Sequence, residues 1–220
     1  MRGLRITAHL STPVATLSQD GRVHLDSVLA YAVMRPIEHT LPPSRQSVQV
    51  IEIPALRCLW RDEDGKPLWA CSDLMPASPT MQSIEYGHRR YPSDRAHLSK
   101  KPSANTAAGQ FKEGRRQMLV TAAPLWEAVA IGNRDEVQAL LDSISHIGGR
   151  SVNYGRVIRW EVTIDDAVTE QDVINRRSVP VAAGLEHSGT LNSFCGWTPP
   201  YWYHPWYTAC MEPEQCSYQK

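Results

Sequence analysis

The chain has 220 residues, and its 23 lysines and arginines balance 23 aspartates and glutamates, so its formal net charge is zero. This length allows one large domain, or one domain with a substantial extension. A zero net charge excludes attraction to nucleic acid through the field of the whole chain, so any such site must depend on a local concentration of basic residues.

The first part of the chain is predicted to form strands around one helix. Residues 4–10 alternate apolar and polar side chains, as a half-buried strand does. Apolar residues then recur at helical spacing over residues 23–32 and predict a helix of about three turns. Residues 47–59, rich in valine and isoleucine and interrupted by Pro54, predict a second strand. After an acidic turn, residues 67–71 predict the partner strand of a hairpin.

The next part of the chain predicts a second helix between strands. Residues 76–114 show no periodicity and are rich in proline, serine and glycine, which predicts a long loop that is mobile or functional. Residues 118–129, broken at Pro124, predict a third strand, Asn133 caps a predicted helix, and residues 157–164 predict a fourth strand. Strand, helix, strand, strand, helix, strand is the order of the ferredoxin-like fold.

A glycine-rich loop lies between the last predicted helix and the last predicted strand. Glycine lets the backbone approach a ligand closely, arginine forks and backbone amides can bind phosphate, and a tyrosine ring can stack on a base. The loop does not open a helix after a strand, so it is neither a dinucleotide fingerprint nor a P-loop. The alternative, a tight turn, would need only one glycine. The residues predicted to contact RNA here are Gly148, Gly149, Arg150, Ser151, Tyr154, Gly155 and Arg156.

Basic residues are concentrated in residues 85–117, which contain eight lysines and arginines and three acidic residues. In a chain without net charge, this concentration favours contact with phosphates, although a solvated loop is the alternative. The residues predicted to contact RNA in this segment are Arg89, Arg90, Lys100, Lys101, Arg115 and Arg116.

The glycine-rich loop resembles that of the CRISPR RAMP superfamily, the RNA-binding subunits of CRISPR effector complexes. Residues 4–8 and 21–31 look like the first strand and first helix of that family. Residues 67–72 and 150–160 look most like the type IV subunit that caps the 5′ handle of the guide RNA. The resemblance covers roughly residues 1–165.

This resemblance implies an α+β protein with a ferredoxin-like (RRM/RAMP) βαββαβ domain over residues 1–165. An insertion at about 76–117 would form a basic thumb that folds over the guide, and residues 166–220 would be a C-terminal extension packing on the domain. The implied partners are the guide RNA (crRNA), the backbone and large subunits of the effector complex, and target DNA reached through the complex. The implied role is antiviral defense within a ribonucleoprotein.

The C-terminal extension is rich in aromatic residues and proline, which cannot together form a long helix or a central strand. Three explanations stay open: a tail packed on the domain, a docking surface for a neighbouring subunit, and a platform on which RNA bases stack. The aromatic residues are Trp197, Tyr201, Trp202, Tyr203, Trp206 and Tyr207.

Histidines at positions 9, 24, 39 and 146 could supply the general acid or base for RNA cleavage. His24 begins the first predicted helix, an arrangement that resembles some processing RAMP nucleases, but no acid–base triad is evident. We therefore expect no catalytic residue and place His24 among the RNA-binding residues. The alternatives are a metal-independent endoribonuclease that processes CRISPR repeat RNA, and an unrelated ferredoxin-like protein that binds no RNA.

No metal or cofactor is expected. Acidic residues such as Asp26 and the pair at 165–166 lie in turn-like or strand-end contexts that predict solvated carboxylates. The five cysteines include no Cys-x-x-Cys pair, so reduced thiols are favoured over a zinc site. No apolar run approaches the length of a membrane span, and no signal peptide is recognisable, which predicts a soluble cytoplasmic protein that does not bind membranes.

Overall fold

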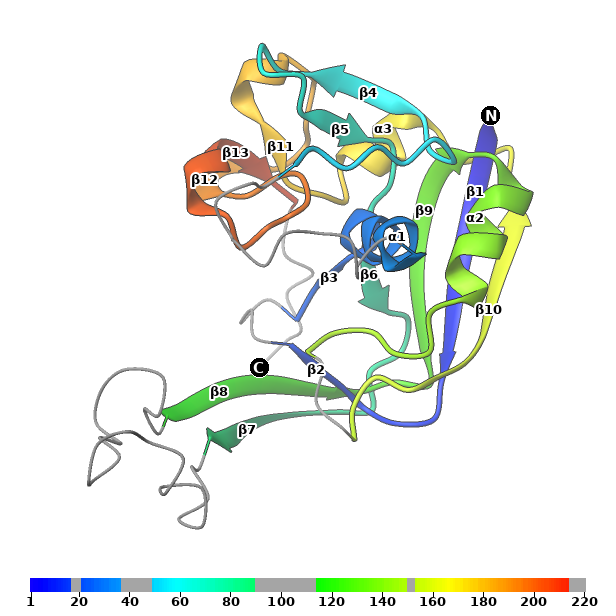
Figure 1. The fold of residues 1–220 in the computed structure, drawn as a ribbon, viewed down its shortest axis with the longest axis vertical. Coiled ribbons are helices and arrows are strands. Elements are labelled where there is room, and N and C mark those ends of the chain that lie inside the picture. The colour runs from blue at the N-terminus through cyan, green and yellow to red at the C-terminus, as the bar shows by residue number, and fades with distance from the viewer. Residues whose placement is uncertain (17–20, 37–48, 90–113, 150–152, 214–220) are drawn as a thin grey trace.

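The computed structural model describes residues 1–16, 21–36, 49–89, 114–149 and 153–213 (Figure 1). Within these ranges the protein is mixed α/β with antiparallel sheets, which is compatible with a ferredoxin-like fold. In this described part of the chain, no helix is both long enough and apolar enough to cross a membrane.

The largest sheet has five strands, and every neighbouring pair in it is antiparallel. Its strands are β1 (Arg2–Leu10), β3 (Val23–His24), β6 (Asp73–Pro76), β9 (Leu125–Gly132) and β10 (Val157–Ile164). Their order across the sheet is β10, β1, β9, β6, β3. Leu4, Ile6 and Ala8 are fully buried, because alternate residues of the central strand β1 point into the core.

Helices lie on both faces of this sheet. The helices α1 (Leu25–Met34) and α2 (Arg134–Asp142) pack on one face, where Leu29, Val137 and Leu141 join the buried residues of β1 in one hydrophobic core (Figure 1). The short helix α3 (Glu170–Ile174) packs on the other face, and its Val173 belongs to a second cluster with Val129 of β9.

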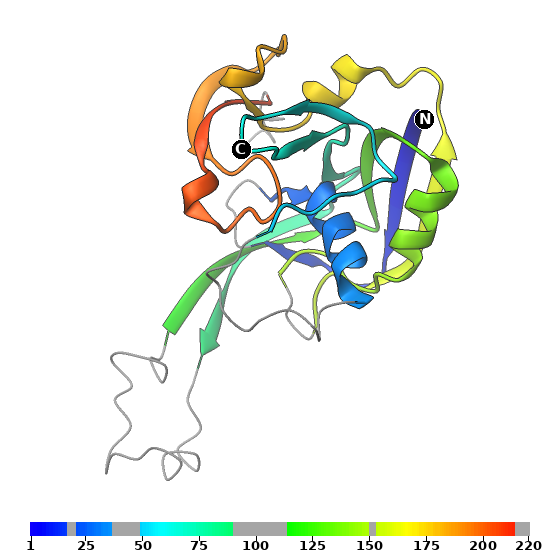
Figure 2. The ribbon, with the colours of Figure 1, turned by 45° about the horizontal axis from the view of Figure 1, so that its top comes forward.

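Three smaller sheets complete the fold. One contains β2 (Val14–Thr16), β7 (Met81–Arg89) and β8 (Gly114–Ala122), and another is the hairpin of β4 (Cys58–Arg61) and β5 (Pro67–Trp69). The third contains β11 (Val179–Pro180), β12 (Thr190–Cys195) and β13 (Thr208–Glu212), accompanied by the 3-10 helices η4 (Val181–Ala183) and η5 (His204–Trp206). Figures 1 and 2 show the β7–β8 hairpin projecting away from the body of the protein.

Elements with strong local signals lie where the sequence predicts them. The strands β1 and β10, the helices α1 and α2, and the β4–β5 hairpin are confirmed. Asn133 is the N-cap of α2, and its side chain accepts hydrogen bonds from the backbone N–H groups of Asp135 and Glu136. These two hydrogen bonds satisfy backbone amides that the helix itself leaves unpaired.

The predicted strand at 47–59 is wrong over its described part before β4. Residues 49–57 form no strand, and Leu56 makes only an isolated bridge with Gly132. Ile53, Ala55 and Leu56 are nevertheless buried in the main core. The apolar composition of this segment therefore reflects packing of a turn at Pro54 rather than a hydrogen-bonded ladder.

Two other segments differ from the prediction, one expected as a strand and one as a loop. The predicted single strand at 118–129 is two strands, β8 and β9, separated at Pro124, and the predicted loop at 76–114 contains the whole of β7. Ile84 and Tyr86 on β7 are exposed, because the hairpin projects from the body. A strand without a buried face does not show the alternation that reveals strands in a sequence.

A buried ion pair fixes the C-terminal extension to the main domain. The Arg177 guanidinium donates to the Asp26 carboxylate at 3.0 Å, and both side chains are almost fully buried. The same guanidinium donates to the backbone carbonyls of Trp69 and Trp197, and the Tyr201 hydroxyl donates to Asp26 at 2.9 Å. Burial opposes the charge of Arg177, but Tyr201 and Asp26 raise its pKa, so it stays ionised. The prediction that Asp26 is a solvated carboxylate is therefore wrong.

Candidate nucleic-acid interface

The glycines of the loop between α2 and β10 are required by close packing. Gly148 and Gly155 have positive φ angles of 78° and 65°. A Cβ atom on Gly148 would lie 2.7 Å from the carbonyl oxygen of Ala15, and one on Gly155 would lie 1.9 Å from that of Ile147. Glycine is the residue that fits both positions: Gly148 allows close packing against β2, and Gly155 allows close packing against Ile147.

Backbone amides of the loop are already hydrogen-bonded within the protein. The N–H of Gly149 donates to Ala15 at 2.6 Å, and the N–H of Gly155 donates to Pro13 at 2.7 Å. The expectation that loop amides meet phosphates therefore does not hold for these two groups in this conformation. Any phosphate contact near them must come mainly from side chains, such as the exposed Arg156.

Tyr154 connects the glycine loop to the β7–β8 hairpin, which is called the basic hairpin below. Its hydroxyl donates a short hydrogen bond to the Glu85 carboxylate on β7. This hydrogen bond, together with burial, raises the pKa of Tyr154 above its ordinary value. The sequence predicts the loop and the basic segment as separate sites, and this contact places the loop beside the hairpin that carries the basic residues at its far end.

The backbone of Arg156 is also fixed. Its N–H donates to the Thr12 hydroxyl at 2.9 Å, and its carbonyl accepts from the N–H of Ser11 at 3.0 Å. A pocket of about 350 Å³ lies next to this position, between the end of α2 and β10, and Ser145 and Arg159 are among its lining residues. The side chain of Arg156 is therefore exposed on a backbone held by two hydrogen bonds, and the neighbouring Val157 lines this pocket.

The far end of the β7–β8 ladder carries three of the predicted basic residues. His88 pairs with Arg115, Gly87 with Arg116, and Arg89 with Gly114. The hairpin thus holds the backbone of these arginines away from the body (Figure 2). The other predicted contacts Arg90, Lys100, Lys101, Arg150 and Ser151 lie outside the described residues.

The open face of the main sheet, meaning the β1 and β10 part of the face opposite α1 and α2, has a different character from the loop and hairpin. On β1 and β10, both described in full, the side chains on this face are polar or charged, and their one ring is the imidazole of His9. His9 and Arg159 both contact the Glu161 carboxylate, at 3.2 and 3.4 Å, and Arg5 pairs with Asp165. RNA-recognition modules of this architecture stack bases on aromatic side chains of the sheet. These two strands present no Phe, Tyr or Trp on this face, and the His9 ring is paired with Glu161.

His24 lies at a contact with the C-terminal extension. Its Nδ1 is 2.7 Å from the Asp73 carboxylate, and its ring stacks on Tyr201 with centroids 3.8 Å apart. Burial opposes protonation, but Asp73 and Asp26 outweigh it and raise the pKa of His24. The described contacts of His24 are thus with β6 and the extension, not with the glycine loop. No sequence signal pairs His24 with Asp73, 49 residues later in the chain.

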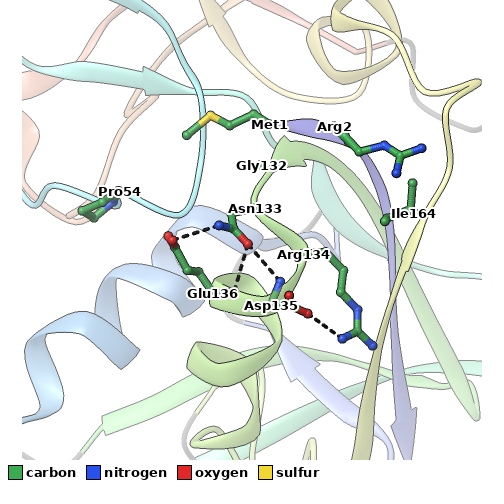
Figure 3. Close-up of a pocket in the computed structure, with 9 residues that line it drawn as sticks. All are labelled: Met1, Arg2, Pro54, Gly132, Asn133, Arg134, Asp135, Glu136 and Ile164. Carbon is green, nitrogen blue, oxygen red and sulfur yellow. Dashed lines mark hydrogen bonds and ion pairs between the residues drawn. The ribbon is translucent and has the colours of Figure 1, made fainter.

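Figure 3 shows a pocket of about 320 Å³ beside the start of α2. Its polar groups already bind one another, because Asn133 donates to Glu136 at 2.9 Å and Arg134 pairs with Asp135 at 2.8 Å. None of the predicted RNA contacts lines this pocket. Among the described residues, no group of histidine, cysteine and acidic side chains is arranged to hold a metal ion.

Comparison with protein families identifies the class of the chain. The model of the CRISPR type IV associated protein Csf3 matches residues 2–123 and 88–213. The protein is therefore a type IV CRISPR-associated protein, as the resemblance to RAMP proteins of type IV systems predicts.

More particularly, the chain belongs to the Csf3 family. This membership supports a role in antiviral defense and implies other subunits of a CRISPR complex as partners. A search of curated proteins finds no match.

Proposed function

We propose that the chain is a non-catalytic RNA-binding subunit that binds the 5′ handle of the guide RNA and caps the backbone filament of a type IV complex. The observation that carries this proposal is the Tyr154–Glu85 contact, which holds the glycine loop against the hairpin that carries the predicted arginines. Membership of the Csf3 family supplies the complex in which such a surface would act.

The order of the elements supports a ferredoxin-like core for this subunit. The elements β1, α1, β6, β9, α2 and β10 follow one another as strand, helix, strand, strand, helix, strand. In the sheet, β1 and β9 are the neighbouring central strands, and β10 and β6 flank them. This arrangement agrees with the βαββαβ pattern, extended by β3 at one edge.

The proposed surface would bind RNA mainly through phosphates. Arginine forks can pair with phosphate oxygens, and the tyrosine ring of the loop can stack on an unpaired base. The projecting hairpin carries Arg89, Arg115 and Arg116 on a ladder that is long enough to reach beyond the body. The hairpin would act as a thumb over the guide, while the glycine loop would grip the RNA where the thumb joins the body.

The double variant Arg150→Ala/Arg156→Ala tests this surface. Loss of two phosphate contacts should weaken binding of the handle RNA and reduce the slope of log affinity against log salt by about 1.4 for a single strand. The matched control is Arg2→Ala/Arg57→Ala, which removes two exposed arginines that pair with Asp166 and Glu170. An unchanged salt slope in the loop variant, or an equal loss in the control, would contradict the proposal.

The His24–Asp73 pair favours one alternative, a metal-independent endoribonuclease. A carboxylate that orients an imidazole and raises its pKa is a common arrangement for general acid catalysis. We favour a structural role for His24 at the contact with the C-terminal extension, because Tyr201 stacks on its ring and Asp73 is buried. Purified protein should leave repeat RNA intact in the presence of a metal chelator. Specific cleavage that disappears in His24→Ala would establish the alternative instead.

A further inference from the structure

The C-terminal extension displays a cluster of exposed and half-buried aromatic rings that the RNA-binding surface does not use. This aromatic surface is defined by Phe194, Trp202, Tyr203, His204, Trp206 and Tyr207. Its rings pack in two groups: Phe194 and His204 both lie against Tyr207, and Tyr203 lies against Trp202 and Trp206. Phe194 is 72% exposed and Trp202 is 57% exposed.

The buried anchors of the extension on the domain are other residues. Attachment is made by the buried Trp197 and by Arg177, which bonds to the Trp197 carbonyl and to Asp26. Clustered exposed aromatic side chains are uncommon on the free surface of soluble proteins and are enriched in protein interfaces. The exposed rings of the aromatic surface therefore favour a protein contact there.

The surface contains almost no charge. Residues 188–211 include no aspartate, glutamate, lysine or arginine, in a chain of which 21% of the residues are charged. Lys66 approaches the Trp206 ring at 5.8 Å, but its ammonium is paired with Asp62 and Asp64. Sites that stack single-stranded RNA on aromatic rings combine them with a positive groove for the phosphates. The aromatic surface instead matches an apolar, weakly charged protein.

The backbone that carries the rings is held in place before any partner binds. The N–H of Tyr203 donates to Pro200 at 3.1 Å, and the N–H of Trp206 donates to Tyr203 at 3.0 Å. The Tyr207 hydroxyl donates to the carbonyl of Tyr201, which is itself tied to Asp26. Such pre-ordering lowers the entropy lost on association.

We propose that the aromatic surface docks another protein subunit of the type IV complex, through an apolar and weakly charged patch on that subunit. The inference depends on membership of the complex and not on the proposed RNA contacts. Both views of the ribbon place β12 and β13 apart from the projecting end of the β7–β8 hairpin (Figures 1 and 2). One molecule can therefore hold the guide with one surface and a protein neighbour with the other.

The test is reconstitution of the complete complex with a tag on this chain. The variant is Phe194→Ser/Trp202→Ser, and the matched control is Ile158→Ser/Ile164→Ser, which changes two exposed apolar residues of β10. We expect the variant, but not the control, to lose one protein subunit from the purified complex by about tenfold, as truncation of anchor residues does. The free variant should keep the melting temperature and the handle-RNA affinity of the wild type.

Two results would overturn the proposal. Retention of every subunit by the variant would show that no protein docks on the aromatic surface. Loss of RNA affinity with all subunits retained would identify a base-stacking platform instead. A single variant, Trp202→Glu, places a charge in the surface and should give the same subunit loss if the double variant folds poorly. Because the RNA affinity of the free chain is measured separately, failure of the proposed RNA surface would be seen independently.

Discussion

Removal of the buried Arg177 charge should destabilise the whole protein and not only its extension. Arg177→Met leaves the Asp26 carboxylate buried with the Tyr201 hydroxyl as its remaining described donor. Breaking a buried pair by removing one partner costs about 3 to 5 kcal/mol. For a chain of this length, that loss corresponds to a fall in melting temperature of about 6 to 20 °C.

The double variant Asp26→Asn/Arg177→Met separates the ion pair from the packing around it. In this variant neither charge is left alone, so its free energy of unfolding should exceed the value expected from adding the two single losses, by about 1 to 3 kcal/mol. Urea denaturation of the wild type, the two single variants and the double variant gives this coupling energy directly. A loss below about 1 kcal/mol in Arg177→Met, or strict additivity in the cycle, would refute the assignment of this pair as the attachment of the extension.

Three further outcomes are expected. Tyr154→Phe removes the hydroxyl that bonds to Glu85 and should weaken binding of handle RNA by about fivefold, or about 1 kcal/mol, in a filter-binding assay. Unchanged binding would mean that the contact does not orient the hairpin. Gly155→Ala places a Cβ against a backbone oxygen at positive φ and should lower the free energy of unfolding by about 2 to 5 kcal/mol, measured in urea. Because Asp73 raises the pKa of His24 against the effect of burial, the pair stabilises the fold below the unfolded histidine pKa of about 6.5. The difference in unfolding free energy between wild type and His24→Gln should therefore shrink as the pH rises through the folded pKa, and a constant difference from pH 6 to pH 9 would contradict this role.

Features encoded by neighbouring residues could be predicted from the sequence. The Asn133 cap depends on the next three residues, and the alternation of β1 and β10 depends on each strand having one buried face. The glycine-rich loop was also recognisable, because Gly148 and Gly155 are needed where the backbone takes positive φ. These signals are local, and the structure agrees with them.

Contacts between distant segments could not be predicted in this way. Asp26 and Arg177 are separated by 151 residues, and Tyr154 and Glu85 by 69. Nothing near Asp26 in the sequence shows that a cation will meet it inside the protein, so a buried carboxylate was expected to be solvated. The β7 strand was missed for a related reason, since a projecting hairpin has no buried face to impose a pattern.

The most direct test of the proposed RNA surface is crosslinking of the assembled complex. A guide RNA that carries photoreactive nucleotides in its 5′ handle would be irradiated, and the crosslinked peptides of this chain identified by mass spectrometry. We expect crosslinks in the glycine loop, residues 145–156, and in the two strands of the basic hairpin, 81–89 and 114–122. Crosslinks confined to the open face of the main sheet, or to the aromatic surface, would contradict it.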